Sequence, residues 1–185
     1  VIYEGIINPC INDIKAFVGA SAQYADVPIG YGPIDFCGLI PRTIEACSEN
    51  NDPSVCQSIY NHNEFTLTFS GNGEMKNYIS TTTPWDIKKQ DIKSVTIDGI
   101  TSIGSNAFNG CTSLKSVTIN SGIFVGNNAF HGCKSITTIS FPDSMKTIGD
   151  NAFNGCTGLN AITNWGGLTS LGLNSFTQTA FPTLT

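Results

Sequence analysis

The sequence Ile-Gly-Ser-Asn-Ala-Phe occupies residues 103–108, and variants of it return at residues 125–130, 148–153 and 171–176. The phenylalanines that end the four copies are 22, 23 and 23 residues apart. A fixed period of this length is typical of a solenoid, in which each coil buries its apolar face only against neighbouring coils. Solenoids present a long, regular surface and usually no deep pocket. The period therefore favours a binding protein over an enzyme.

The first half of each repeat predicts a short strand. Residues 92–97, 114–119 and 136–141 share the order apolar, polar, polar, apolar, polar, apolar, and residues 159–164 follow it less closely. The last three positions alternate, as in a strand with one buried face. We expect these strands to stack in parallel, with irregular or 3-10 segments that return the chain across the solenoid. The predicted fold class is thus an α/β solenoid with a narrow parallel sheet.

The return segments carry a glycine two residues before a recurring asparagine. We expect the glycine to permit a tight turn. Two structural roles fit the asparagine: it caps the short helical turn that Ala-Phe begins, or it bonds the backbone of the neighbouring coil. The column consists of Asn106, Asn128, Asn151 and Asn174.

Two files of side chains are expected to form the core of the repeats. A fully buried aliphatic or aromatic side chain contributes roughly 1.5–3 kcal/mol. The three repeat cysteines each follow a glycine at one phase, so we expect free, shielded thiols in register. The files comprise Phe108, Phe130, Phe153 and Phe176, and Cys111, Cys133 and Cys156.

Residues 1–63 show no period and contain the other four cysteines, Cys10, Cys37, Cys47 and Cys56. An even set in a loop-rich segment indicates two disulfides and an oxidising compartment. Of the three possible connectivities we favour Cys10–Cys37 with Cys47–Cys56, because the second pair closes a short local loop. A zinc site is disfavoured because no Cys-x-x-Cys occurs.

The chain divides into two predicted domains. Residues 1–63 form a disulfide-containing N-terminal cap or accessory domain, and residues 64–185 form the repeat domain. The repeat domain has a lead-in over residues 64–91 and about four repeats over residues 92–185. Solenoids need such caps because the first coil otherwise exposes its apolar end.

Local patterns predict further elements near the start of the chain. Apolar spacing over residues 11–18 predicts an amphipathic helix, and Asp52-Pro53 followed by Val55, Ile59 and Tyr60 predicts a second. Alternation over residues 65–70 predicts a half-buried strand, and Trp85 is expected to pack as a lid on the first coil.

Composition excludes several classes of function. The net charge is −5, from 9 basic and 14 acidic residues, and nucleic-acid binding needs clustered Lys and Arg. The basic cluster at Lys88, Lys89 and Lys93 is interrupted by Asp86 and Asp91, so we interpret it as a solvated face. No apolar run approaches the ~20 residues that span a membrane, so direct membrane insertion is not expected.

Catalytic patterns are weak. The two histidines, His62 and His131, form no recognisable catalytic pattern in the sequence, and Asp98, Asp143 and Asp150 fall at different phases of the repeat. We therefore expect no enzymatic activity, no catalytic residue, no metal and no cofactor.

The pattern Ile-Gly-x-Asn-Ala-Phe-x-Gly-Cys-x-Ser-Leu-x-x-Val-x-Ile, which runs from Ile103 to Ile119, resembles the BspA-type leucine-rich repeat. The resemblance extends upstream to the strand and turn at residues 67–75 and to Pro84-Trp85. It implies a leucine-rich-repeat solenoid in a secreted or surface-attached protein of bacteria or some protists, with adhesion to host matrix proteins or other cells. It also implies partner binding through a concave face lined by the strands.

Carried over by position, the residues of this binding face are Lys93, Ser94, Thr96, Lys115, Ser116, Thr118, Thr137, Thr138, Ser140, Asn160 and Thr163. Small hydroxyl residues also suit any exposed strand, so the serines and threonines of this face have a purely structural interpretation as well. The functional interpretation is a weakly charged patch for a protein or glycan partner, with weak salt dependence. The alternatives are a structural or assembly role for the solenoid and recognition by residues 1–63.

Overall fold

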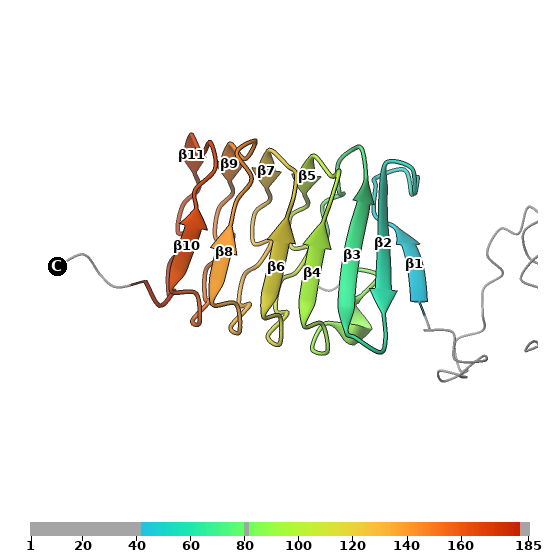
Figure 1. Cartoon of the computed structure of the whole chain (residues 1–185), viewed down its shortest axis with the longest axis horizontal. Helices are drawn as coiled ribbons and strands as arrows, with labels where there is room; N and C mark the ends of the chain where they lie inside the picture. Colours follow the sequence, from blue (N-terminus) through green and yellow to red (C-terminus); the bar gives the residue numbers. More distant parts are fainter. Residues whose placement is uncertain (1–41, 80–81, 182–185) are drawn as a thin grey trace, which may run out of the picture. The chain divides into compact units, whose positions relative to one another are not determined.

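The structure is a computed structural model, and it describes residues 42–79 and 82–181. The predicted helix over residues 11–18 and the predicted Cys10–Cys37 pair lie outside these ranges. The described residues all belong to one compact unit. In Figure 1 its coils stand side by side in a row, each running from a long strand to a short one.

The strands fall on two opposite faces of the stack. The elements are β1 (Arg42–Ala46), β2 (Cys56–Asn61), β3 (Thr66–Gly71), the 3-10 helix η2 (Asp86–Lys88), β4 (Ser94–Ile97), β5 (Ser102–Ile103), β6 (Ser116–Ile119), β7 (Phe124–Val125), β8 (Thr138–Ser140), β9 (Thr147–Ile148), β10 (Ala161–Asn164) and β11 (Ser170–Leu171). One face holds β1-β2-β3-β4-β6 and the pair β8-β10, and the other holds β5-β7-β9-β11.

The predicted parallel stacking is confirmed. β3, β4 and β6 are parallel and in register, so that Thr68, Thr96 and Thr118 lie in one row. The return segments differ from the expectation, because each contains a two-residue strand and turns. Within the described ranges the named 3-10 helix is η2, which precedes the first repeat strand. The fold is therefore a solenoid with almost no helix.

The repeat phenylalanines stack in a single file between the two faces. Ring centroids are 5.0 Å apart for Phe108–Phe130, 5.1 Å for Phe130–Phe153 and 5.2 Å for Phe153–Phe176. These distances match the ~4.8 Å between hydrogen-bonded strands. Trp85 heads the file as a lid, with its ring stacked 5.9 Å from that of Phe108. Offset stacking of this kind adds roughly 0.5–1.5 kcal/mol per pair beyond area burial.

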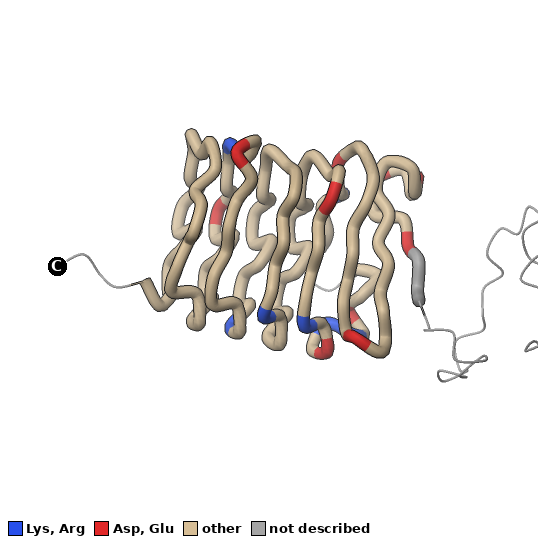
Figure 2. The backbone as a smooth tube through the Cα atoms, in the orientation of Figure 1, with Lys and Arg blue, Asp and Glu red and all other residues tan. Residues whose placement is uncertain are grey.

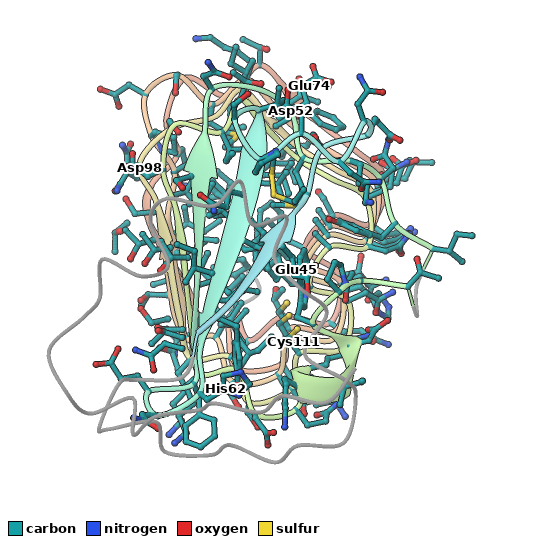
Figure 3. All side chains as sticks on the ribbon, turned by 90° about the vertical axis from the view of Figure 1, so that its right-hand side faces the viewer. Glu45, Asp52, His62, Glu74, Asp98 and Cys111 are labelled. Carbon is teal, nitrogen blue, oxygen red and sulfur yellow. A yellow bond between two sulfur atoms is a disulfide. The ribbon has the colours of Figure 1, made fainter. Side chains whose placement is uncertain are left out.

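The repeat cysteines form a second buried file of free thiols. The Sγ of Cys133 donates to the Phe108 carbonyl at 3.1 Å, and that of Cys156 to the Phe130 carbonyl at 3.1 Å. These two thiols therefore bond the backbone of the preceding coil. Figure 3 looks along the stack from the β1 end and places Cys111 among the interior side chains.

The glycine of the repeat phrase has a role that differs from the one expected. Asn106 shows the second role expected for the asparagine, because its Nδ2 donates to the Tyr78 carbonyl of the preceding segment at 2.8 Å. Asn106, Asn128, Asn151 and Asn174 have φ between 54° and 58°, in the left-handed region that asparagine tolerates better than most residues. The asparagines therefore make the tight turn, and the turn that follows does not form a helix.

The glycine is needed for a different reason, which is close approach between coils. A Cβ at Gly126 would lie 2.5 Å from Ser105 N and 2.7 Å from the Gly104 carbonyl carbon. Only a residue without a side chain fits there.

The predicted helix over residues 52–60 is wrong. Asp52 does accept a hydrogen bond from Ser54 N at 2.8 Å, but a single turn follows and the strand β2 begins at Cys56. Inward burial alternates at Cys56, Ser58 and Tyr60, which is the period of a strand. β2 pairs antiparallel with both β1 and β3, and these backbone bonds outweigh the local helix signal.

The predicted Cys47–Cys56 disulfide is confirmed, and it ties the end of β1 to the start of β2. Residues 42–61, from the predicted N-terminal block, thus extend the sheet of the repeats with two antiparallel strands. β2 thus occupies the backbone edge of β3 that faces away from the repeats.

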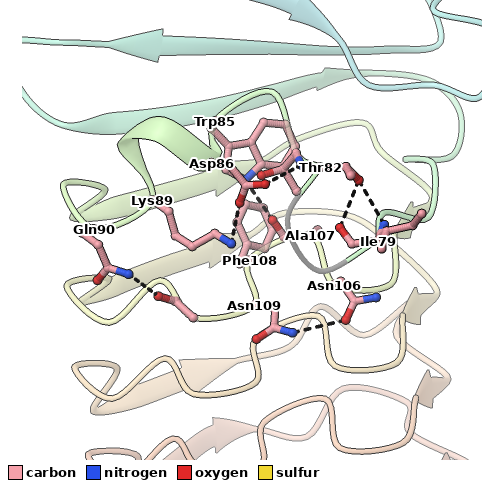
Figure 4. A network of polar contacts seen from close by, with 12 residues as sticks. Ile79, Thr82, Trp85, Asp86, Lys89, Gln90, Asn106, Ala107, Phe108 and Asn109 are labelled. Atoms are coloured by element: carbon pink, nitrogen blue, oxygen red, sulfur yellow. Dashed lines mark hydrogen bonds and ion pairs between the residues drawn. The ribbon is translucent and has the colours of Figure 1, made fainter.

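The lead-in segment is fastened to the first repeat by polar contacts (Figure 4). Trp85 Nε1 donates to the Ala107 carbonyl at 2.8 Å, and Asp86 pairs with Lys89. Gln90 Nε2 donates to the Gly110 carbonyl at 3.1 Å. Of the predicted basic cluster, Lys89 is thus held by an ion pair with Asp86.

Candidate functional site

The strand face is the outer surface of β4, β6, β8 and β10. All the residues predicted for it from the sequence are exposed or half-buried there: Lys93, Ser94, Thr96, Lys115, Ser116, Thr118, Thr137, Thr138, Ser140, Asn160 and Thr163. Side chains between them, such as Val95 and Ile139, point into the core. Successive side chains of each strand therefore point alternately to the solvent and into the core.

The register brings several of these side chains together. Ser94 lies opposite Ser116 and Thr96 opposite Thr118. The last coil departs from the file, because a bulge between Ile162 and Asn164 sets Asn164 opposite Ser140 and takes Thr163 out of register. The hydroxyl file is therefore regular over β4 and β6 and irregular at β10.

Charge is confined to the margins of the strand face. Figure 2 shows the middle of the repeat strands free of charged residues, with basic residues gathered at one end of β4 and β6. Lys93 Nζ lies 4.2 Å from the centre of the Phe65 ring, which holds this ammonium against the lead-in strand. The middle of the strand face therefore presents hydroxyl groups and no charged side chain.

The sheet of the strand face is interrupted between β6 and β8. Asp98 N donates to the Phe69 carbonyl at 3.0 Å, and Asn120 N donates to the Ile97 carbonyl at 2.9 Å. The equivalent residue of the next coil is Pro142, which has no N–H to offer to Ile119. No ladder joins β6 to β8 within the ranges that the structure describes. Pro142 thus removes one backbone donor at the break that separates β1-β2-β3-β4-β6 from the pair β8-β10.

A shallow groove of about 450 Å³ lies at this interruption. Its walls come from the ends of β6 and β8 and from Asn164 of β10. The lining residues are Val117, Thr118, Ile119, Asn120, Ser140, Phe141, Pro142, Asp143 and Asn164.

One wall of the groove is held by hydrogen bonds. Asn164 Nδ2 donates to the Phe141 carbonyl at 2.9 Å and to Asp143 Oδ1 at 3.2 Å. Gly166 N donates to Asn164 Oδ1 at 3.0 Å, which fixes the amide orientation. The groove therefore offers an oriented carboxylate and amide beside the hydroxyls of Thr118 and Ser140.

Sequence reasoning missed Asn120 and Asn164 and considered Asp143 only as a catalytic partner. The available signal was Pro142, because the residue after the strand has a backbone N–H in the two preceding repeats and is a proline in this one. A proline in a central strand position marks an edge or an interruption.

A smaller hollow of about 180 Å³ lies near the cap and includes His62, Tyr60 and Trp85 in its lining. Burial, followed by the nearby charge of Lys88, lowers the pKa of His62. The rings of His62 and Tyr60 pack edge to face with centroids 4.7 Å apart, so this histidine has a packing role. Among the described residues, no three His, Cys, Asp or Glu side chains gather in a way that could hold a metal ion.

The repeats match a known family over residues 87–185, which is more than half of the chain. The matching family model describes the BspA type leucine rich repeat region, in six copies. The chain belongs to the BspA-type leucine-rich-repeat family. The resemblance inferred from the repeat phrase is thus confirmed.

Solved structures of leucine-rich-repeat proteins are similar to this BspA-type chain. A protein of Eubacterium ventriosum is 21% identical, with 67% of this chain and 44% of that chain covered and a TM-score of 0.47. A protein of Bacteroides ovatus is 25% identical, with coverages of 61% and 34% and a TM-score of 0.43. A leucine rich cell surface protein of Faecalibacterium prausnitzii is 24% identical, with coverages of 70% and 46% and a TM-score of 0.41.

The BspA-type chain spans less than half the length of each of these three proteins. No curated protein matches it significantly. Within residues 42–79 and 82–181, no helix is both long and apolar enough to cross a membrane.

Proposed function

We propose that this BspA-type solenoid is an extracellular or cell-surface module that binds a partner protein through its strand face and serves in adhesion. The observation that carries the proposal is the strand face itself. It is an exposed, hydroxyl-rich surface with no charged residue in the middle of its strands, on a scaffold fixed by strand pairing and by the phenylalanine file. Rigid surfaces bind with a smaller loss of conformational entropy.

The groove between β6 and β8 is the centre of the proposed contact. Asp143 and Asn164 are already oriented by their mutual hydrogen bond, so a partner meets donors and acceptors in fixed positions. Loops and side chains of a folded protein fit a shallow, open groove of about 450 Å³ better than a small metabolite, which needs an enclosed pocket.

An extracellular location is supported by the Cys47–Cys56 disulfide. Disulfides form and persist in oxidising compartments and are rare in the cytosol. Adhesion also suits a surface with little charge, because contact by shape and neutral hydrogen bonds persists at extracellular salt.

The test uses the whole chain, oxidised, and purified collagen, laminin and fibronectin immobilised for surface plasmon resonance. Thr118→Arg and Thr138→Arg place a long cation on either side of the groove. Thr147→Arg places the same side chain on β9 of the opposite face and serves as the matched control. We expect at least ten-fold weaker binding for the two strand-face variants only, with melting temperatures within about 2 °C of each other, since surface changes cost about 0.5 kcal/mol or less.

Equal binding by all three variants would contradict the proposal and favour recognition by residues 1–63. A ten-fold loss of affinity between 0.1 and 0.5 M NaCl would refute the view that neutral hydrogen bonds and shape dominate the contact. Binding that disappears after enzymatic deglycosylation of the matrix protein would change the partner from protein to glycan.

A further inference from the structure

The groove between β6 and β8 lies within the stack of coils, where both of its sides have described neighbours. β6 pairs with β4 on one side, and β8 pairs with β10 on the other. The polar residues that line the groove are nevertheless exposed: Thr118, Asn120, Ser140, Asp143 and Asn164. The described coils therefore leave the polar groups of this groove open to a ligand.

Asp143 is the charged residue of the groove, and the other lining residues are uncharged. No described Lys, Arg or His side chain forms an ion pair with Asp143. The nearest cation in sequence, Lys146, has its Nζ close to Gly167 and does not line the groove. The groove thus carries a negative charge that no cation of its own lining balances.

The carboxylate of Asp143 is oriented, and one of its oxygens stays open. Oδ1 accepts from Asn164 Nδ2 at 3.2 Å, and the same nitrogen donates to the Phe141 carbonyl at 2.9 Å. An amide nitrogen has two hydrogens, so Asn164 has no donor left for a ligand. Oδ2 of Asp143 accepts no hydrogen bond from the described residues. This wall of the groove therefore offers acceptors to a ligand.

The backbone adds a further acceptor on the opposite wall. Asn120 N donates to the Ile97 carbonyl, but Pro142 cannot make the equivalent bond to the Ile119 carbonyl. Among the described residues no other backbone N–H takes the place of Pro142 at this carbonyl. An acceptor left without a donor is costly unless water or a ligand supplies one. The groove thus favours a positively charged group with several N–H donors.

We propose, on the basis of the function proposed above, that the groove receives an arginine side chain of the partner protein. Its guanidinium donates to Asp143 and to the Ile119 carbonyl. A guanidinium has five N–H donors in a planar fork, no acceptor and a permanent charge, which matches a carboxylate beside a carbonyl. A lysine ammonium is a more strongly hydrated point charge with three donors, so it fits this set of acceptors less well.

A single exposed ion pair agrees with a contact that is otherwise neutral. Such pairs contribute little in water and are screened by salt. We therefore expect the affinity for the partner to fall about two- to three-fold between 0.1 and 0.5 M NaCl. This is less than the ten-fold fall that would refute the neutral contact of the whole strand face.

Titration of the whole oxidised chain, labelled with nitrogen-15, tests the proposal by nuclear magnetic resonance. One probe is the peptide acetyl-Gly-Arg-Gly-amide, and the other has citrulline in place of arginine, which replaces the guanidinium by a neutral urea group of similar shape. We expect a Kd on the order of 1–10 mM for the arginine peptide, with shifted signals at Asn120, Asp143 and Asn164. The citrulline peptide should bind roughly five-fold more weakly.

Two matched variants separate a local contact from a general effect of charge. Asp143→Asn keeps an oxygen that can accept from Asn164 and removes the charge, so it should weaken binding of the arginine peptide roughly five-fold. Asp98→Asn makes the same change in net charge at an exposed residue that follows β4 and does not line the groove. This control should bind both peptides as the wild type does.

Equal binding of the two peptides would overturn the proposal, and so would equal losses in Asp143→Asn and Asp98→Asn. Either result leaves the proposed function standing if the matrix proteins still bind and still respond to Thr118→Arg. Conversely, binding of the arginine peptide that depends on Asp143 supports the proposal even if collagen, laminin and fibronectin all fail to bind. The two hypotheses can therefore fail separately.

Discussion

Truncation of the central phenylalanine, Phe130→Ala, tests the physical basis of the whole fold. Phe130 is fully buried, and its ring is stacked at 5.0 Å on Phe108 and at 5.1 Å on Phe153. Replacement of a buried phenylalanine by alanine typically costs about 3–5 kcal/mol in the free energy of unfolding. Loss of two stacked pairs, each worth about 0.5–1.5 kcal/mol, places the expected cost near the upper end, at about 4–5 kcal/mol.

The matched comparison is Phe176→Ala at the end of the same file. Phe176 is half-buried and stacks on a single repeat phenylalanine, Phe153, at 5.2 Å. A terminal coil has one neighbour in place of two. We therefore expect a cost of about 2 kcal/mol, roughly half of the central value.

Urea denaturation followed by far-ultraviolet circular dichroism measures both free energies. Phe130→Leu is the control for loss of the ring alone and should cost less than Phe130→Ala, because it leaves a smaller cavity. A cost for Phe130→Ala that is equal to or below that for Phe176→Ala would refute the one-dimensional coupling of the coils.

Four further predictions concern the turns, the cap and the thiols. Gly126→Ala should cost about 1–3 kcal/mol in urea denaturation, because its Cβ would meet Ser105 N at 2.5 Å. Asn128→Val should cost more than Asn128→Gly, because the φ of 56° strains a β-branched residue, and similar melting temperatures would contradict this. Reduction of Cys47–Cys56, nine residues apart, should lower stability by about 2–3 kcal/mol, measured with and without reductant against a Cys47→Ala/Cys56→Ala variant. Burial raises the pKa of Cys156 to about 12, so the folded state keeps a proton that the unfolded chain releases at lower pH. The contribution of Cys156 to the free energy of unfolding should therefore be complete below about pH 8.5 and decrease as the pH rises toward 12. A Cys156→Ala variant whose stability has the same pH profile as the wild type would contradict this.

The stacking of the coils could be predicted from the sequence because each coil of a solenoid uses the same local structure. Phe108, Phe130 and Phe153 recur at a fixed phase, and only a stacked arrangement buries all three. The Cys47–Cys56 bond was also predicted, because the two cysteines are nine residues apart and close a short local loop around Asp52-Pro53. The family followed from the same phrase.

Other features depended on contacts between segments. The signal at Asp52-Pro53 is a genuine turn, but β2 forms after it because β1 and β3 offer backbone partners on both sides. The glycine of the repeat phrase serves approach between coils, and its asparagine takes the left-handed turn, which a linear pattern does not distinguish.

The amino-acid sequence by itself determined the period, the buried files and the side of each strand that faces solvent, because these follow from side-chain polarity at a fixed spacing. Only the tertiary structure decided where the sheet opens. The missing N–H of Pro142 matters because Pro142 borders the same groove as Ile119, which lies 23 residues earlier in the sequence. Backbone hydrogen bonds between coils join residues that are neighbours in space and distant in sequence.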